Sequence, residues 1–134
     1  MPLAEEGDFN LSGTQEEAEA SGFLDTGKEQ YRKGNYTAAI ASFTKALQLR
    51  NVPFYIQIIV LDKRAATWEM IGGEANLELA LQDGMRMIQL SKVLTAGYLR
   101  VGRTYKLLNR HESAQKVLKS GIEQVGVSGP KFEV

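Results

Sequence analysis

Cysteine is missing from this 134-residue chain, which excludes disulfide bonds, thiol chemistry and cysteine-ligated metal sites. Histidine occurs once, at His111, and a second metal ligand at a suitable spacing is missing. Long apolar runs are missing as well. The longest, residues 56–61, contains Gln57 and ends before Asp62, far short of the roughly 20 residues that a membrane-spanning helix needs. We therefore expect a protein that does not cross a membrane.

The chain also lacks an excess of charge of either sign. Sixteen Lys and Arg residues balance sixteen Asp and Glu residues, so there is no overall field to draw the protein onto nucleic acid or an anionic membrane. Residues 1–12 carry three acidic residues and no basic one, the opposite of a secretory signal or a mitochondrial presequence. We expect a nuclear or cytoplasmic protein that binds neither nucleic acid nor membranes directly.

What the chain does have is a pattern of small and large residues that occurs three times, each time over the length of a helix pair. The first copy consists of Phe23, Gly27, Tyr31, Gly34, Tyr36, Ala39, Phe43 and Ala46. The second copy keeps Ala65, Trp68, Gly72, Ala80, Gly84 and Met87. The third copy has Tyr98, Gly102, Tyr105, Ala114, Leu118 and Gly121. Gly84 stands where the pattern has a large residue.

This spacing has a physical cause. A small residue lets two helix backbones approach closely, while a large residue one turn away fills the remaining gap. The two small positions are 12 residues apart in the first and third copies and 15 apart in the second. Insertions of about four residues at 51–55 and of about three at 72–76 explain the irregularities around a period of ~34 residues. The pattern predicts stacked helix pairs, because a lone pair could not bury its apolar stripe.

The pattern also predicts the division of the chain. Residues 1–20 are acidic and poor in branched apolar side chains, so we expect them to be mostly disordered, with a frayed helical extension where Thr14 and Glu17 form a capping box. The helix pairs should occupy residues 21–125, in repeats at about 21–51, 53–91 and 95–125. Glycine at 34 is suited to the first turn, Asn76 and Thr95 are suited to cap helices, and residues 126–134 should form a flexible tail.

The pattern resembles the tetratricopeptide repeat family over about residues 22–125. The resemblance implies an all-α fold in which three tetratricopeptide helix pairs form a right-handed α-solenoid, or α-α superhelix. It also implies that the chain is a protein-binding module. In such arrays the first helix of each pair lines the concave groove.

By register, cations occupy much of that groove. The candidate peptide-binding residues are Lys28, Tyr31, Arg32, Lys63, Leu99, Arg100, Arg103 and Lys106. Arginine forms paired hydrogen bonds to carboxylate or phosphate, and Tyr31 and Leu99 would supply apolar contact. The groove is therefore predicted to bind an acidic or phosphorylated segment of a partner protein. Ordinary solvated lysines and arginines are the alternative interpretation.

Residues for catalysis are not apparent. His111 falls at a turn, where a packed or solvent-facing role is the simpler interpretation. The carboxylates Asp62, Glu69, Glu74 and Glu78 have basic neighbours, so a solvated charged face is expected rather than acid or base catalysis. No glycine cluster follows a strand or forms a phosphate-binding loop. We expect a protein that is not an enzyme and has no cofactor or metal.

Two branches of the family are candidates. One is the chaperone co-factor type, which grips the acidic C-terminus of heat-shock proteins through a carboxylate clamp of lysine, asparagine and arginine. Of the clamp positions, only Arg100 matches the family. The five positions hold Leu24, Lys28, Lys63, Ala96 and Arg100.

The other branch is the N-terminal repeat segment of fungal F-box proteins that also carry leucine-rich repeats, the substrate receptors of SCF-type ubiquitin ligases. Three runs of sequence, residues 61–67, 80–88 and 97–103, resemble that segment, Gly84 and Tyr98-Leu99-Arg100 most tellingly. This resemblance implies a module that tethers a receptor to a partner, with replication-machinery proteins as candidates. Weak self-association through the last helix is a further hypothesis, because no polar capping helix follows it.

Overall fold

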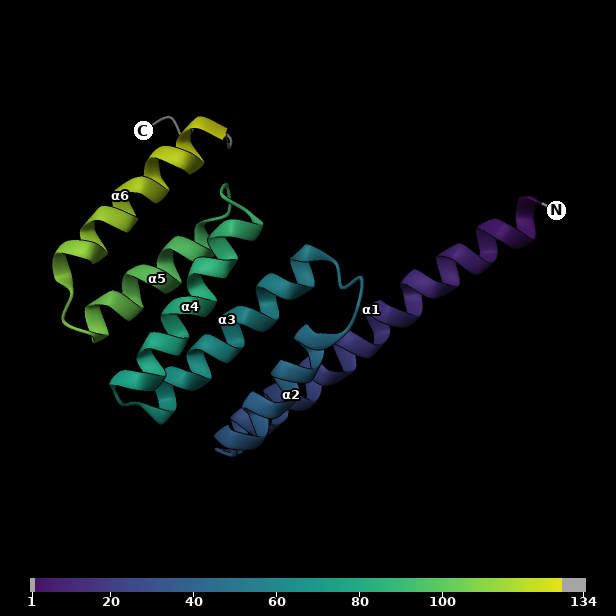
Figure 1. Cartoon of the computed structure of the whole chain (residues 1–134), viewed down its shortest axis with the longest axis horizontal. Coiled ribbons are helices and arrows are strands. Elements are labelled where there is room, and N and C mark those ends of the chain that lie inside the picture. The colour runs from purple at the N-terminus through teal and green to yellow at the C-terminus, as the bar shows by residue number, and fades with distance from the viewer. Residues whose placement is uncertain (1, 129–134) are drawn as a thin grey trace. The chain divides into compact units, whose positions relative to one another are not determined.

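The computed structural model describes residues 2–128, and the side chains of residues 15–126. Within that range the chain is entirely helices and connecting turns (Figure 1). The helices are α1 (Pro2–Arg32), α2 (Tyr36–Gln48), α3 (Phe54–Ile71), α4 (Glu74–Leu90), α5 (Thr95–Leu107) and α6 (His111–Ser128). The predicted all-α fold class is confirmed. The chain forms two compact units, Met1–Val60 and Leu61–Val134, with the boundary inside α3.

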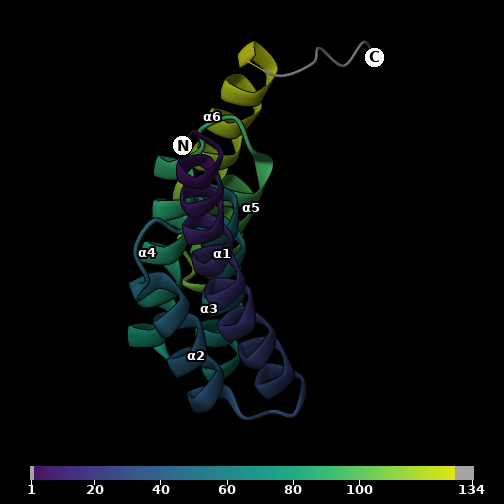
Figure 2. The same cartoon turned by 90° about the vertical axis from the view of Figure 1, so that its right-hand side faces the viewer.

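In the first unit, α1 and α2 lie side by side and are joined by a tight turn (Figures 1 and 2). The small residue of the pattern sits where expected, because a Cβ added at Gly27 would lie 2.4 Å from the ring of the fully buried Phe43. The start of α3 covers this pair. The core consists of Ala20, Leu24, Ala39, Phe43, Ala46, Val52, Ile56 and Val60.

Helix α1 begins much earlier than the sequence predicted. It covers Pro2–Arg32. Residues 2–20, which we expected to be mostly disordered, therefore belong to this helix. Over residues 15–20 the side chains give a physical reason. Ala20 is fully buried in the first-unit core, and Glu16 accepts a hydrogen bond from Asn51 at 3.4 Å. The predicted start at residue 21 is therefore corrected to include at least this turn of helix.

In the second unit, α5 packs against both α4 and α6. Here the small-and-large pattern takes the same form, since a Cβ at Gly102 would lie 2.8 Å from Leu118. The turn between α5 and α6 also copies the turn between α1 and α2. Gly34 has φ 82° and Asn109 has φ 60°, and asparagine is one of the few non-glycine residues that tolerate this region. In each turn the next residue donates to a carbonyl five residues back, at 2.8 Å.

Gly84 is explained by α5. A Cβ on Gly84 would lie 2.7 Å from Cγ2 of Val101 and 3.3 Å from the backbone nitrogen of the same residue. Val101 is fully buried. The space that Phe43 and Leu118 fill in the other pairs is thus taken by a side chain from the following helix. Glycine at 84 allows α4 and α5 to approach closely.

The other helix ends lie near their predicted positions, with two corrections. The cap of α4 is Gly73 rather than Asn76, whose side chain instead donates to the carbonyl of Gly72 at 2.8 Å. The cap of α5 is Leu94, and Thr95 is the first helical residue.

Helix α6 continues to Ser128, through the predicted start of the tail at 126; residues 129–134 lie outside the described range. No helix within the described residues is long and apolar enough to cross a membrane.

A buried ion pair joins α3 to α4 in the second unit. Arg64 donates from Nε to Asp83 Oδ2 at 2.9 Å and from a terminal nitrogen to Oδ1 at 2.6 Å. The Asp83 side chain is 5% exposed. Burial raises the pKa of the Asp83 carboxyl, while the hydrogen bond and charge of Arg64, with a contribution from Trp68, oppose the rise. Arg64 therefore offsets part of the cost of burying this carboxylate.

Replacing Arg64 by methionine should make stability strongly dependent on pH. The folded-state pKa of Asp83 then rises further above its unfolded value of about 3.9. A raised carboxyl pKa contributes stability below the unfolded pKa that is lost as pH rises through the folded pKa. We expect a loss of about 3 kcal/mol at pH 7, which shrinks as the pH is lowered. Urea unfolding across a pH series measures this loss of stability. Arg86→Met, at an exposed position of α4, is the control. A loss of the same size at every pH would contradict this account.

Candidate functional site

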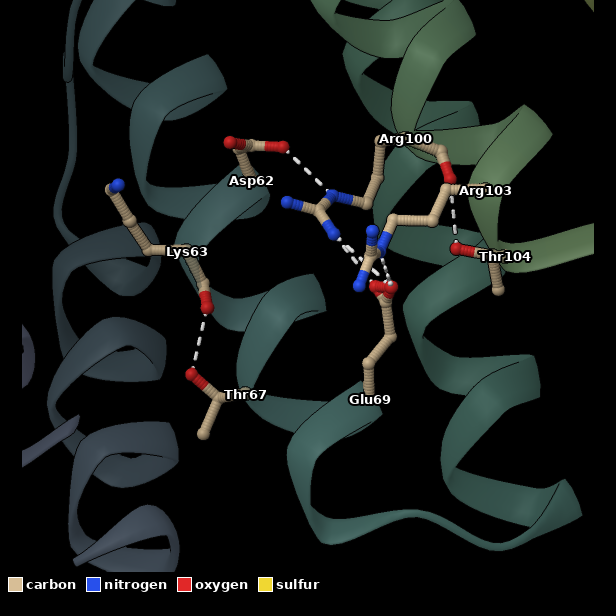
Figure 3. Close-up of polar contacts among 7 residues, drawn as sticks. All are labelled: Asp62, Lys63, Thr67, Glu69, Arg100, Arg103 and Thr104. Atoms are coloured by element: carbon tan, nitrogen blue, oxygen red, sulfur yellow. Dashed lines mark hydrogen bonds and ion pairs between the residues drawn. The ribbon is translucent and has the colours of Figure 1, made fainter. Parts of the chain in front are cut away.

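Four charged side chains of the second unit form an ion-pair network between α3 and α5 (Figure 3). Arg100 donates from Nε to Asp62 at 2.8 Å and from Nη1 to both oxygens of Glu69, at 2.6 and 3.1 Å. Arg103 donates from Nε to Glu69 at 3.2 Å. We call Asp62, Glu69, Arg100 and Arg103 the α3/α5 network. Its two acids and two bases cancel, so the network as a whole adds no net charge to this surface.

Arg100 is a structural residue as well as a candidate binding residue. Its side chain is 14% exposed, and that of Glu69 is 6% exposed. Burial opposes the charge of Arg100, but the hydrogen bonds and charges of Asp62 and Glu69 outweigh it, so the pKa of the guanidinium lies above its ordinary value. Arg100 is thus held between two carboxylates and is poorly placed to receive a ligand without losing them.

Arg103 and Lys106 are the accessible cations of α5. The Arg103 side chain is 68% exposed, and Lys106 is also exposed. Leu99, one turn before Arg103, is 58% exposed. These residues surround two shallow hollows, one of about 280 Å³ beside Asp62 and Arg100 and one of about 430 Å³ beside Leu107 and Leu118. We call Leu99, Arg103 and Lys106 the α5 surface.

Lys63 is exposed and lies on α3, one residue after Asp62. Its ammonium group points away from the α3/α5 network (Figure 3). Its carbonyl accepts a hydrogen bond from the Thr67 hydroxyl at 2.7 Å within the same helix. The structure therefore separates this candidate from the cations of α5.

The remaining candidates belong to the first unit. Lys28 is exposed, and Arg32 is exposed and paired with Glu29 on the preceding turn. Tyr31 is partly buried against the first-unit core, and its ring meets that of Tyr36 edge-on at 5.5 Å. Leu24, at a clamp position of the chaperone co-factor type, belongs to the buried core. In this unit, Lys28 and Arg32 are therefore the accessible candidates, whereas Tyr31 has a clear packing role.

The two acids that organise the network were not predicted as site residues. Asp62 and Glu69 were expected on a solvated face, yet Glu69 is nearly buried and binds two arginines. The available signal is their separation of seven residues, about two helical turns, which puts both on one side of α3. Their partners on α5 are more than 30 residues away and depend on how the helices pack.

His111 is the exposed first residue of α6. Among the described residues, no group of three or more histidine and acidic side chains is arranged to hold a metal ion. The accessible chemistry of the α5 surface is thus that of cations beside an apolar side chain.

Comparisons with known proteins agree with this architecture. A family model for the tetratricopeptide repeat matches residues 27–52 and 96–124. Two solved structures have similar folds, the first and second tetratricopeptide domains of Spaghetti (RPAP3), each bound to the HSP90 peptide SRMEEVD. The first has a TM-score of 0.68 at 21% sequence identity, and the match covers 81% of the present chain and 80% of the solved chain. The second has a TM-score of 0.69 at 18% sequence identity, and the match covers 88% of the present chain and 96% of the solved chain.

Two curated proteins are similar in sequence. Protein DIA2 of Eremothecium gossypii is 38% identical over 69 residues, which are 52% of this chain and 10% of that protein. A DnaJ homolog subfamily C member 7 homolog of Dictyostelium discoideum is 24% identical over 99 residues, 72% of this chain and 17% of that protein. The chain thus spans less than a fifth of either curated relative. Its first and third helix pairs contain tetratricopeptide repeats, and its fold is the all-α fold of tetratricopeptide domains.

Proposed function

We propose that this chain is a protein-interaction adaptor whose α5 surface binds an acidic segment of a partner protein. The observation that carries the proposal is the exposure of Arg103 and Lys106 beside the exposed Leu99, next to shallow hollows. An arginine can form a two-point pair with a carboxylate or phosphate. Leu99 would contact an apolar residue of the same segment, so binding does not depend on charge alone.

The α3/α5 network has a supporting role in this proposal. Asp62 and Glu69 hold Arg100 against α3, and this contact fixes the helix on which Arg103 lies. Asp62, the more exposed of the two acids, would repel a bound carboxylate that came close to it. An acidic ligand should therefore lie toward Arg103 and Lys106, away from Asp62.

The similar solved structures support an acidic ligand. Both hold the peptide SRMEEVD, which has three acidic side chains and a terminal carboxylate. In the present chain, the clamp positions of the chaperone co-factor type hold Leu24, Lys63 and Ala96 in addition to Lys28 and Arg100. Arg100 already binds two carboxylates. We therefore place recognition on the acidic side chains of a segment rather than on a terminal carboxylate.

Binding of a fluorescent SRMEEVD peptide, followed by anisotropy at low salt, tests this proposal. We expect the double substitution Arg103→Glu/Lys106→Glu to weaken binding by about tenfold or more, since accessible charge pairs are reversed. The matched control is Lys116→Glu/Lys119→Glu, which makes the same change of charge on exposed positions of α6. Equal weakening by both pairs would show only a general effect of charge and would contradict a site on α5.

An amidated form of the same peptide separates the two branches of the family. The α5 surface should bind it almost as well as the free acid, because the side-chain carboxylates remain. A chaperone co-factor with a degenerate carboxylate clamp is the second candidate function, favoured by the HSP90 peptide in the similar structures. That function requires a large loss of affinity on amidation.

We further propose a more specific function, which rests on the resemblance of residues 61–67, 80–88 and 97–103 to fungal F-box proteins. On this proposal the chain is the module that tethers an SCF-type substrate receptor to its partner, in the nucleus or the cytoplasm, and it is not itself an enzyme. Replication-machinery proteins with acidic or phosphorylated segments are the candidate partners. Co-purification of such proteins with the wild-type chain, and their loss with Arg103→Glu/Lys106→Glu, is the expected result. Retention of the same partners by the variant would remove this proposal.

A further inference from the structure

A large apolar hollow lies between α5 and α6, next to the hollow that Arg103 and Lys106 line. Its volume is about 720 Å³, and its lining residues are Thr95, Tyr98, Leu99, Leu118, Gly121, Ile122, Val125 and Gly126. Ile122 is 75% exposed. We call this feature the α5/α6 hollow. An exposed isoleucine beside an open apolar hollow is a costly arrangement in water, and such a surface commonly marks a site of contact.

The first unit contains an equivalent surface, and there it is covered. The shift that aligns Gly27 with Gly102 also aligns Leu24 with Leu99, Phe43 with Leu118, Ala46 with Gly121 and Leu47 with Ile122. In the first unit these positions belong to the core or pack against it, under Val52, Ile56 and Val60. Two of the covering residues, Ile56 and Val60, are one turn apart on α3.

Exposure differs sharply between the two copies. Leu24 is 9% exposed, whereas its equivalent Leu99 is 58% exposed. Leu47 is partly buried, whereas its equivalent Ile122 is among the most exposed hydrophobic residues of the described chain. Within the described residues, the apolar surface of the third helix pair is therefore open where the equivalent surface of the first pair is covered.

We propose that the α5/α6 hollow is a second binding site, which takes an amphipathic helix of a partner protein with aliphatic residues at positions i and i+4. The covering helix of the first unit supplies the template, because Ile56 and Val60 have this spacing. Helix-in-groove recognition uses the same i, i+4 spacing of anchors. Burial of Ile122 and Leu99 would supply much of the binding energy.

Charge indicates a further feature of the partner helix. The α5/α6 hollow and the hollow beside Arg103 and Lys106 share Leu99 and Leu118 in their linings. A helix in the first hollow therefore has one end near these two cations, where acidic side chains fit best. The two sites share Leu99, but this site can be tested separately from the proposed function, because Ile122 and Val125 line the α5/α6 hollow and are outside the α5 surface.

A peptide with the sequence of residues 51–66 is the probe, because it contains the aliphatic pair of the template. We expect it to bind the chain in trans and to shift the methyl NMR signals of Leu99, Leu118 and Ile122. Ile122→Asp should weaken binding by about tenfold or more, since a charge then faces an apolar contact. The matched control is Ile59→Asp, at an exposed position of α3, which should leave binding unchanged. Both variants alter residues that are more than 40% exposed, so their folding should be retained.

A short peptide can be too short to stay helical alone, so the second experiment joins the probe helix covalently to the chain. A copy of residues 51–71 joined after Val134 by a flexible linker should raise the thermal unfolding midpoint, and Ile122→Asp should remove the rise. No binding in trans together with no stabilisation when tethered would overturn the proposal. Dimerisation of the chain alone that Ile122→Asp abolishes would also overturn it, because the occupant would then be a second copy.

Discussion

Replacing Arg100 by alanine should lower the free energy of unfolding by about 3 kcal/mol or more, because it removes the main partner of a buried carboxylate, that of Glu69. Glu69 is 6% exposed and receives two hydrogen bonds from Arg100. Its other arginine, Arg103, is 68% exposed and binds more weakly, at 3.2 Å. Urea denaturation measures the loss.

Arg103→Ala is the control for that experiment, since it truncates the other arginine of the α3/α5 network. An exposed ion pair contributes about 0–1 kcal/mol, so this variant should remain close to the wild type in stability. The double variant Arg100→Met/Glu69→Leu should recover most of the loss, because it removes both buried charges together. Similar losses for Arg100→Ala and Arg103→Ala would show that the network is solvated and does not hold α5 against α3.

Gly84→Leu should destabilise the chain by about 2 kcal/mol, although it restores the large residue that the repeat pattern has at this position. A side chain at 84 collides with Val101, whose Cγ2 lies 2.7 Å from the added Cβ. The backbone nitrogen of Val101 is 3.3 Å away, so a change of rotamer alone does not make room. Thermal and urea unfolding give the size of the effect.

The double variant Gly84→Leu/Val101→Ala identifies the cause. Val101→Ala alone should cost stability by leaving a cavity, but in the double variant the new leucine fills part of that space. The two losses should therefore not add, and the double variant should be more stable than their sum predicts. Strict additivity would mean that Gly84 is required for some reason other than the approach of α5.

The repeat pattern was sufficient to predict the all-α fold and most helix ends, because its small residues mark the points where helices touch. Gly27 against Phe43 and Gly102 against Leu118 are contacts between residues of one pair, close together in sequence. The sequence predicted only a frayed helical extension from Thr14, since the acidic composition of residues 1–20 gives no sign of Ala20 as a core residue. The local composition of a helix does not reveal which of its faces another helix will cover.

The candidate site was predicted less well, for a related reason. Sequence register placed Arg100 and Arg103 one turn apart on the same helix, but it did not reveal that Glu69 reaches both of them. That contact depends on the packing of α3 against α5, more than 30 residues apart. As a result, two arginines one turn apart on the same helix have different roles: Arg100 is held between carboxylates, and Arg103 is accessible.

A charge-reversal experiment tests the central claim, that the α5 surface recognises acidic side chains. The probe is SRMKKVD, in which lysines replace the two adjacent glutamates of the peptide held by the similar structures. We expect the wild-type chain to prefer the acidic peptide and Arg103→Glu/Lys106→Glu to prefer the lysine peptide, by about tenfold in each case. If both chains prefer the same peptide, recognition of an acidic segment by Arg103 and Lys106 is contradicted.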